Sequence, residues 1–520
     1  MRHLVTAVSI AIAFAAVAEQ PDLQMVTRIR QEGLRNSKVM EYARVLTDEC
    51  GARLTGSPNM RKANEWTRDK LTEIGLSGAR LEAWEFGRGW VSDGISVRML
   101  SPDSLQLYAA AYAWSPSTDG VVKGRVIKAK LETKEDLEKH RGKLEGAIVL
   151  VGEPREMKPQ DKPALNRYDD NDLANLSGYS IPAPRDNARM SAFAQRREFR
   201  RLLAQFTMDE KIAAIVQSGN GEGGVFRVQS AGTWRNDEPA GVATVGLAPE
   251  HFARISRLID SGKDVELEIE MRNRFLDEDR NAWNTVAEIP GSDKKGELVL
   301  LGGHLDSWHN GTGATDNAAG VAIMMEAARI IKALGVTPKR TIRVALWAGE
   351  EQGLLGSRAY VARHVAKRSE PKDPEQAKLP ASQRTEKGDL LLGQEHSKIS
   401  AYFNLDNGTG RIRGIYAQEN AAVAPIFKGW LEPLHDLGAT TVTMRNTTST
   451  DHIPFDEVGV PGFQFIQDQV EYFSRTHHTN WDTYERLQQE DLMQAAVVVA
   501  TFAWEAANRP QLLPRKPLPK

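Results

Sequence analysis

The sequence lacks several features that would point to particular classes of protein. It has one cysteine, Cys50, so no disulfide can form within the chain. Its 67 basic and 69 acidic residues leave a net charge of −2, which gives no indication of binding to nucleic acid or to a membrane surface. Beyond the first residues no apolar stretch is long enough to span a membrane, and the G-x-S-x-G motif of serine hydrolases does not occur.

The first 18 residues have the pattern of a signal peptide. Arg2 provides a basic start, Leu4 to Ala15 form a short apolar segment, and the small residues up to Ala18 form an A-x-A cleavage site. We therefore expect the chain to be exported to the periplasm or the medium, with a mature N-terminus near Glu19. The remaining length predicts two or three domains.

A central stretch combines buried strands with polar residues at their ends. Leu298 to Leu301 and Thr341 to Trp347 are apolar, β-branched runs typical of buried strands, and Val321 to Leu334 between them has helical spacing. This order predicts a parallel strand–helix–strand unit, in which ligands bind beyond the carboxyl ends of the strands. The polar residues that follow the two strands are His304, Asp306, Asp316, Glu350 and Glu351.

Two further segments add residues of the same chemical kind. Ser400 to Leu405 is another apolar run, and Asp406 follows it directly. Farther along, the adjacent histidines His477 and His478 stand in the sequence RTHHTNWDT. Neutral imidazoles and carboxylates are the usual ligands of a hydrolytic zinc ion. The set therefore predicts a metal site at one edge of a sheet.

The whole set resembles the co-catalytic zinc exopeptidases, the family of the zinc aminopeptidases and carboxypeptidase Q. The matching pieces occur in the family's order across roughly 200 residues, and they read GGHLDS, GATDNAAG, GEEQGLLGS, NLDNGTG, STDHIPF and HHTNWDT. The resemblance implies two zinc ions per chain and a peptide substrate. It also implies a cis peptide bond after Asp316.

The resemblance also assigns a role to each residue. His304 and Asp406 would bind one zinc ion, Glu351 and His478 the other, and Asp316 would bridge the two. The remaining roles are those of Glu350, the general base, and of Asp306, which would accept the second ring N–H of His304.

Some positions near the motifs receive no role. His477 is the competitor of His478, which we prefer because the family's ligand directly precedes the Thr of H-T-x-x-D-T. His309, His435 and His452 are expected to be ordinary residues. Residues 445–450 contain no tyrosine, although aminopeptidases of the family can carry one there to stabilise the oxyanion, so no residue is assigned to that task.

The expected fold is α/β, with a mixed, mostly parallel central sheet flanked by helices. Short β-rich runs bounded by Gly and Pro resemble a protease-associated domain inserted into it. We expect a catalytic domain in two parts, at 19–120 and 281–509, the insert at 121–280, and an extended tail at 510–520. Residues 168–201 are expected to be a surface excursion, and residues 367–387, which are charged and contain prolines, an exposed loop.

The sequence thus predicts an exported di-zinc exopeptidase that cleaves small peptides or dipeptides. The alternatives are an aminopeptidase acting on longer peptides, a single-zinc acyltransferase of the glutaminyl cyclase type, and a binding module without activity. All five ligand positions and the base are present, which argues against the last of these. No nucleic-acid partner and no membrane span are expected, and a homodimer stays open.

Overall fold

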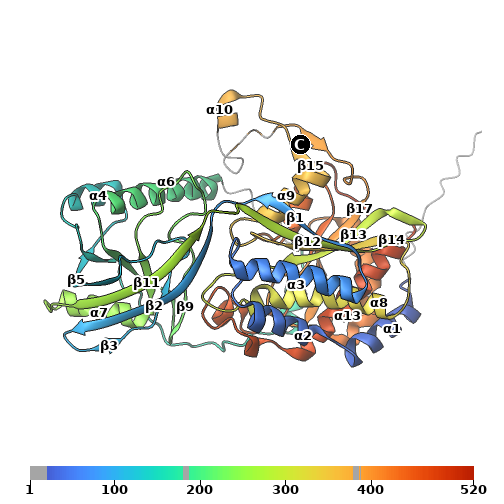
Figure 1. Cartoon of the computed structure of the whole chain (residues 1–520). Helices are drawn as coiled ribbons and strands as arrows, with labels where there is room; N and C mark the ends of the chain where they lie inside the picture. Colours follow the sequence, from blue (N-terminus) through green and yellow to red (C-terminus); the bar gives the residue numbers. More distant parts are fainter. Residues whose placement is uncertain (1–19, 180–186, 379–383, 385, 387, 520) are drawn as a thin grey trace, which may run out of the picture.

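The computed structural model describes residues 20–179, 187–378, 384, 386 and 388–519. The predicted signal peptide, 1–18, lies outside the described residues. Two eight-stranded sheets form two bodies that lie next to each other (Figure 1). Within the described residues, no helix has the length and apolar character needed to cross a membrane.

The central sheet has the order β1-β12-β14-β13-β17-β20-β18-β19. Its middle strands β14, β13, β17 and β20 run parallel to one another, whereas β1, β12 and the β20–β18 pair are antiparallel. The fold is therefore the mixed α/β class that the sequence predicted. The strands are β1 Ser77–Glu85, β12 Asn281–Ile289, β13 Lys294–His304, β14 Arg340–Trp347, β17 Ile399–Asn404, β18 Ile412–Tyr416, β19 Thr441–Thr443 and β20 Gly462–Gln467.

The middle strands are buried on both faces, which is why they read as continuous apolar runs. Successive side chains of β13 alternate between two cores: Val299 and Leu301 belong to one, and Leu298 and Leu300 to the other. All eight residues of β14 are buried. Both faces of these strands must therefore be covered by other elements.

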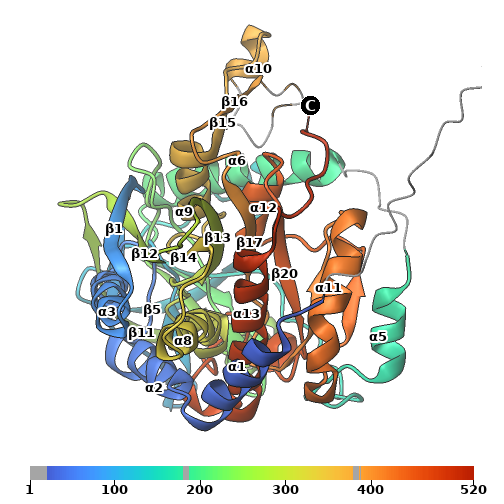
Figure 2. The same ribbon diagram turned by 90° about the vertical axis from the view of Figure 1, so that its right-hand side faces the viewer.

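Helices cover the two faces unequally (Figure 2). The more extensive layer contains α8, whose residues are nearly all buried, together with α13 and the N-terminal helices. The opposite face is covered by the short helices α9 and α12. The helices of the larger layer are α1 Leu23–Arg35, α2 Val39–Arg44, α3 Pro58–Ile74, α8 Ala319–Ala333, α11 Ala424–Leu431 and α13 Gln489–Asn508, and those of the smaller one are α9 Leu355–Tyr360 and α12 His452–Asp456.

The second sheet has the order β3-β2-β11-β5-β6-β7-β10-β4 and is packed with α4, α6 and α7. Its strands are β2 Gly89–Ser101, β3 Leu105–Gln106, β4 Ala109–Ala111, β5 Val121–Ala129, β6 Ile148–Val151, β7 Ala214–Ser218, β10 Thr244–Leu247 and β11 Glu266–Leu276. Its helices are α4 Lys134–His140, α6 Asn187–Asp209 and α7 Pro249–Asp260, and a hairpin of β8 Asn220–Glu222 and β9 Val225–Arg227 accompanies it.

This sheet begins earlier in the chain than the sequence predicted. We placed the start of the insert at residue 121, but β2 already belongs to the second sheet and pairs with β11 from Gly89↔Leu276 to Ser101↔Glu266. That pairing joins segments far apart in the chain, so no local sequence pattern predicts it. The other boundary lies close to the expected one, since β11 ends at Leu276 and β12 begins at Asn281.

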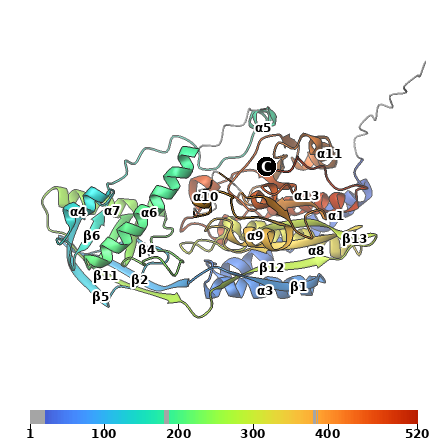
Figure 3. The same ribbon diagram turned by 90° about the horizontal axis from the view of Figure 1, so that it is seen from above.

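Two excursions leave the sheets. The segment after β6 returns to the body that contains the central sheet, where α5 Asp170–Ser177 packs against β19 and lies beside α11 (Figure 3). The second excursion projects from the body of the central sheet (Figure 1). It consists of β15 Ala366–Arg368, α10 Pro374–Lys378 and β16 Leu390–Leu392. The tail from Pro510 contains neither helix nor strand where it is described, and Arg515 attaches it to the carbonyl oxygens of His396 and Ile399.

Candidate metal centre

Three neighbouring parallel strands bring the predicted residues to one edge of the central sheet. His304 is the last residue of β13, where it pairs with Trp347, the last residue of β14. Glu350 and Glu351 follow β14, and Asp406 follows β17, the strand on the other side of β13. The carboxyl ends of parallel strands meet at one edge, so these side chains converge there.

The first group of donors surrounds the ring of His304. Its Nε2 lies 3.1 Å from Oδ1 of Asp316 and 3.2 Å from Oδ1 of Asp406. His304 and Asp316 are buried, and only 9% of the Asp406 side chain is exposed. Three of the five predicted ligands therefore offer one atom each to a common point.

The second group lies on the other oxygen of the same aspartate. Nε2 of His478 is 3.1 Å from Oδ2 of Asp316 and 3.0 Å from Oε2 of Glu351. His477 is farther away, with its Nε2 3.9 Å from the same Oδ2, and its ring packs on that of His478. Asp316 thus has one histidine at each carboxylate oxygen, the arrangement expected of a bridging ligand.

The side-chain atoms of the two groups are better suited to bind divalent cations than to pair with one another. Oδ2 of Asp316 is buried and accepts no hydrogen bond, although His478 Nε2 is 3.1 Å away, and Oε1 of Glu351 is also without a partner among the described residues. Buried carboxylates are costly unless they are paired or coordinate a metal. The carboxylates gathered here outnumber the one buried arginine and two histidines, and they are Asp306, Asp316, Glu350, Glu351, Asp406, Asp451 and Asp482.

The same crowding of carboxylates shifts the pKa values of the metal-free site. Burial alone would lower the pKa of His304, but Asp406 and Glu350 raise it well above its ordinary value. Burial likewise opposes the charged form of His478, and Glu351 and Asp316 raise its pKa to about 10. For the glutamates, burial raises the pKa of Glu351 to about 7 and that of Glu350 well above its ordinary value. Without metal, both imidazoles are therefore protonated at neutral pH.

Asp306 does not occupy the place that the sequence predicted. The atom nearest to Nδ1 of His304 is the backbone carbonyl oxygen of Asp306, at 2.9 Å, while the carboxylate oxygen is 3.7 Å away. The carboxylate instead accepts hydrogen bonds from Thr55 Oγ1 and from the backbone N–H groups of Glu350 and Glu351, at 3.0, 3.2 and 3.3 Å. The carbonyl thus orients the imidazole, and the carboxylate holds the turn that carries both glutamates.

Two further buried residues, which received no role from the sequence, position Asp316. The carboxylate of Asp482 accepts the backbone N–H groups of Thr315 and Asp316, at 2.6 and 3.1 Å. Arg53 donates to five backbone carbonyl oxygens. Three of them, those of Leu305, Thr312 and Gly313, lie within the loop from His304 to Asp316. Both lie in motifs that the sequence displays, HHTNWDT and GARLTGS. The peptide bond between Asp316 and Asn317 is cis, as predicted.

Asp451 was also missed, although it stands in the quoted motif STDHIPF. One of its oxygens accepts a hydrogen bond from Ser357, and the other is buried without a partner among the described residues. Burial raises its pKa to about 7, and its charge helps to raise the pKa of Glu350. In the sequence, the only sign of this buried carboxylate is the Asp of that motif.

The other histidines have partners away from the two groups. His309 contacts the backbone oxygen of Ala111 through Nε2, at 2.7 Å, and burial lowers its pKa to about 4. His452 lies 3.1 Å from the carbonyl oxygen of Thr447, and burial lowers its pKa to about 4 as well. His435 is exposed. That none of the three is a ligand stays a prediction.

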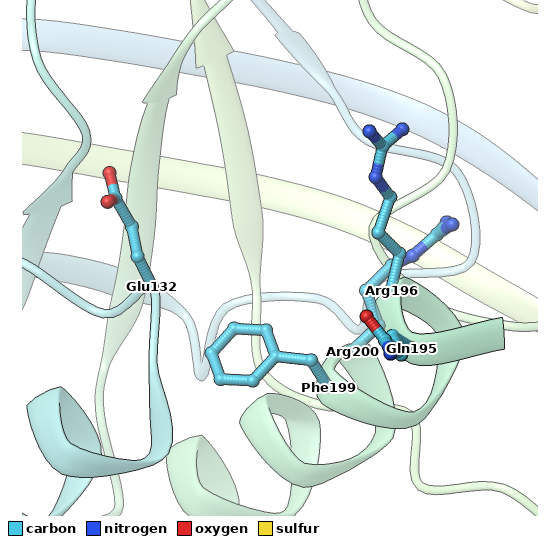
Figure 4. A pocket seen from close by; sticks show the side chains of 5 residues that line it. All are labelled: Glu132, Gln195, Arg196, Phe199 and Arg200. Carbon is cyan, nitrogen blue, oxygen red and sulfur yellow. The ribbon is translucent and has the colours of Figure 1, made fainter. Parts of the chain in front are cut away.

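A groove elsewhere in the molecule does not compete with this site. It has a volume of about 560 Å³ and lies in the inserted body, where the ring of Phe199 on α6 faces Glu132 (Figure 4). Its remaining lining residues are Gln195, Arg196 and Arg200. It contains none of the predicted ligands or the predicted base, so the chemistry is placed at the edge of the central sheet.

Comparisons with known proteins agree with this site. Residues 284–503 match Peptidase family M28, and this segment contains all five predicted ligands. This part of the chain thus resembles peptidase family M28. The match supports a zinc metallopeptidase related to the co-catalytic zinc exopeptidases, as the motifs predicted.

The similarity to known proteins extends beyond the matched segment. Carboxypeptidase Q of Mus musculus is 27% identical over 488 residues, which cover 93% of this chain and 88% of the relative. Among solved structures, a Peptidase M28 precursor from Shewanella amazonensis SB2B superimposes with a TM-score of 0.66, at 24% identity, covering 96% of this chain and 99% of that one. BSAP, a zinc aminopeptidase from Bacillus subtilis, does so with a TM-score of 0.56, at 17% identity, covering 91% and 94%. The two-body fold is thus shared along nearly the whole chain.

Proposed function

We propose that this chain is an exopeptidase of the M28 type that binds two zinc ions and cleaves small peptides or dipeptides, with Glu350 as the general base. The observation that carries the proposal is the position of Asp316, whose two carboxylate oxygens each face a different histidine. His304 and Asp406 would complete the ligands of one ion, and His478 and Glu351 those of the other. The carboxypeptidase Q relatives, which align over most of the chain, support an exopeptidase rather than another use of the fold.

The ions, when bound, would polarise the peptide carbonyl and lower the pKa of a water molecule to near neutrality. Glu350 is the carboxylate left for proton transfer, since Glu351 faces His478 and is committed as a ligand. In the metal-free chain burial and the neighbouring Asp406 raise the pKa of Glu350. Two zinc ions would favour its ionised form, which can accept a proton and then give it to the leaving amine. Asp306 holds the backbone of both glutamates and thereby fixes the division of their roles.

Paired variants of the two glutamates test these roles. Glu350→Gln should keep both zinc ions and lose about 10²–10⁴-fold in kcat, the usual contribution of general-base catalysis. Glu351→Gln should bind less zinc, and added zinc should partly restore its activity. Glu432→Gln, an exposed glutamate at the end of α11, is the matched control and should behave as wild type. Loss of zinc from Glu350→Gln with both ions retained in Glu351→Gln would reverse the assignment.

The substrate range separates the proposal from its alternatives. We would incubate the zinc-loaded enzyme with dipeptides, longer peptides, N-acetylated peptides and a peptide with N-terminal glutamine, and identify the products by mass spectrometry. Rapid cleavage of dipeptides supports the proposal, and preferential removal of N-terminal residues from longer peptides supports an aminopeptidase. Cyclisation of N-terminal glutamine without hydrolysis, together with one zinc ion per chain, would favour the glutaminyl cyclase type.

Export and association complete the proposal. We propose that residues 1–18 are removed during export, which N-terminal sequencing of the enzyme recovered from the medium or the periplasm would test. An intact Met1 on active enzyme would contradict it. Light scattering after size-exclusion chromatography decides between a monomer and the homodimer that the sequence left open.

A further inference from the structure

The inserted body reaches the loop that carries His478. The backbone of Arg227, the last residue of β9, forms a β-bridge with Thr479, the residue after His478. Next to it, the side chain of Asn480 accepts the backbone N–H of Phe226 at 2.9 Å. Two residues beyond Arg227, Nε2 of Gln229 lies 3.0 Å from Nδ1 of His478. The insert is therefore in direct contact with the proposed metal site.

Arg227 stands out in this contact because its charge has no partner. Its guanidinium makes one hydrogen bond, at 3.3 Å to the backbone oxygen of Phe473, and no ion pair with any described carboxylate. The residue is half-buried, and burial lowers its pKa, which Tyr472 and Asp316 raise in turn. Side chains two residues apart on extended chain point to the same side, which agrees with Arg227 and Gln229 both facing the histidine loop.

A second arginine lies beside the first. Arg155 donates a hydrogen bond of 2.8 Å to the side chain of Asn220, and Asn220 is the cross-strand neighbour of Arg227 in the β8–β9 hairpin. The charge of Arg155 lowers the pKa of Arg227, as expected for like charges at close range. Arg155 has no carboxylate partner among the described residues either. The two guanidinium groups thus form a positively charged pair beside the loop that carries His478.

We propose that Arg227, flanked by Arg155, binds the free α-carboxylate at the C-terminus of the peptide substrate. The inference rests on the proposed function and narrows it to dipeptides and other short peptides with an unmodified C-terminus. A dipeptide carries this carboxylate one residue beyond the scissile bond, a reach of roughly 3.5 Å. A guanidinium suits the task because its donors match the two oxygens of a carboxylate. The insert would thus contribute to substrate recognition as well as packing.

Kinetics on a matched pair of substrates test the proposal. We would compare a dipeptide with the same dipeptide amidated at its C-terminus, which removes only the negative charge. The wild-type enzyme should cleave the free acid with a kcat/KM about 10- to 100-fold higher, the usual size of a hydrogen-bonded contact between charged groups. The difference should appear mainly in KM, because the contact exists before the bond is broken.

Variants then locate the recognition. Arg227→Met should raise KM for the free acid by about 10- to 100-fold and leave the amide unchanged, so that the enzyme no longer distinguishes the two. Arg155→Met should have a smaller effect in the same direction, and Arg227→Lys should retain part of the preference. The control is Arg200→Met, an exposed arginine on α6 in the same inserted body, which should keep the wild-type ratio.

A binding measurement provides a readout other than activity. Calorimetry on zinc-loaded Glu350→Gln should show tighter binding of the dipeptide than of its amide, and this difference should vanish when Arg227→Met is added. Equal cleavage of acid and amide by the wild type, or an unchanged preference in Arg227→Met, would overturn the inference while the peptidase assignment stands. Failure to cleave either substrate, with zinc bound, would instead overturn the proposed function on which the inference rests.

Discussion

Zinc binding should release protons, because several of the predicted ligands are protonated in the metal-free site and must lose their protons to bind a metal ion. In the metal-free chain the pKa of His478 is about 10 and that of His304 lies well above its ordinary value, so both are protonated at pH 7. The pKa of Glu351 is about 7, which leaves this ligand half-protonated at the same pH. Metal ligands must be deprotonated, so loading the site at pH 7 should release about two to three protons per chain.

The same count predicts how zinc affinity depends on pH. Each proton released makes the association constant rise tenfold per pH unit, so affinity should rise by roughly 10²–10³-fold between pH 6 and pH 7. Titration calorimetry in buffers of different ionisation enthalpy measures the protons directly, and competition with a chelator measures the affinity. His435→Ala, which removes an exposed histidine, is the control and should release as many protons as wild type. Release of fewer than about one proton per chain would show that the histidines are neutral without metal, contrary to the charges described above.

Three other perturbations test the supports of the site. Asp316→Ala should lose both zinc ions and all activity, because one side chain serves both groups; retention of either ion, by elemental analysis, would count against a bridge. Asp306→Asn should keep zinc but lower kcat by about 10- to 100-fold, since an amide cannot accept both glutamate N–H groups, and full activity would refute that role. Arg53→Met should destabilise folding by at least about 3 kcal/mol, measured by denaturant unfolding, because five carbonyl oxygens lose their donor; an unchanged midpoint would contradict this.

The pattern of local motifs was enough to predict most of the site. His304, Glu351 and Asp406 each lie at or just after the end of a strand that is recognisable by its apolar composition, and parallel strands bring the residues at their carboxyl ends to a common edge. The same reasoning predicted the class of the central sheet. The choice of His478 over His477 came from a motif and stays a prediction. Nε2 of His478 lies 3.1 Å from Asp316 and 3.0 Å from Glu351, whereas Nε2 of His477 lies 3.9 Å from Asp316, and Asp316, His477 and His478 together could hold a metal ion.

Residue type alone, however, does not say which atom of a residue is used. Asp306 was assigned to the ring of His304 by its carboxylate, whereas the backbone carbonyl lies there and the carboxylate accepts from the turn after β14. That choice depends on the course of the backbone between two strands. Arg53 and Asp482 escaped notice for a related reason: their partners are backbone groups, which every sequence contains and no motif displays.

Short runs of residues were therefore enough to predict the chemistry: the kinds of donors, their order, and the strands that end beside them. Which distant segments meet depends on the tertiary structure. It assigned β2 to the inserted sheet through pairing with β11, and it placed Arg227 beside Thr479 and the metal site. Contacts of this kind join residues separated by more than a hundred positions, and they form only where the packing of two whole bodies brings their edges together.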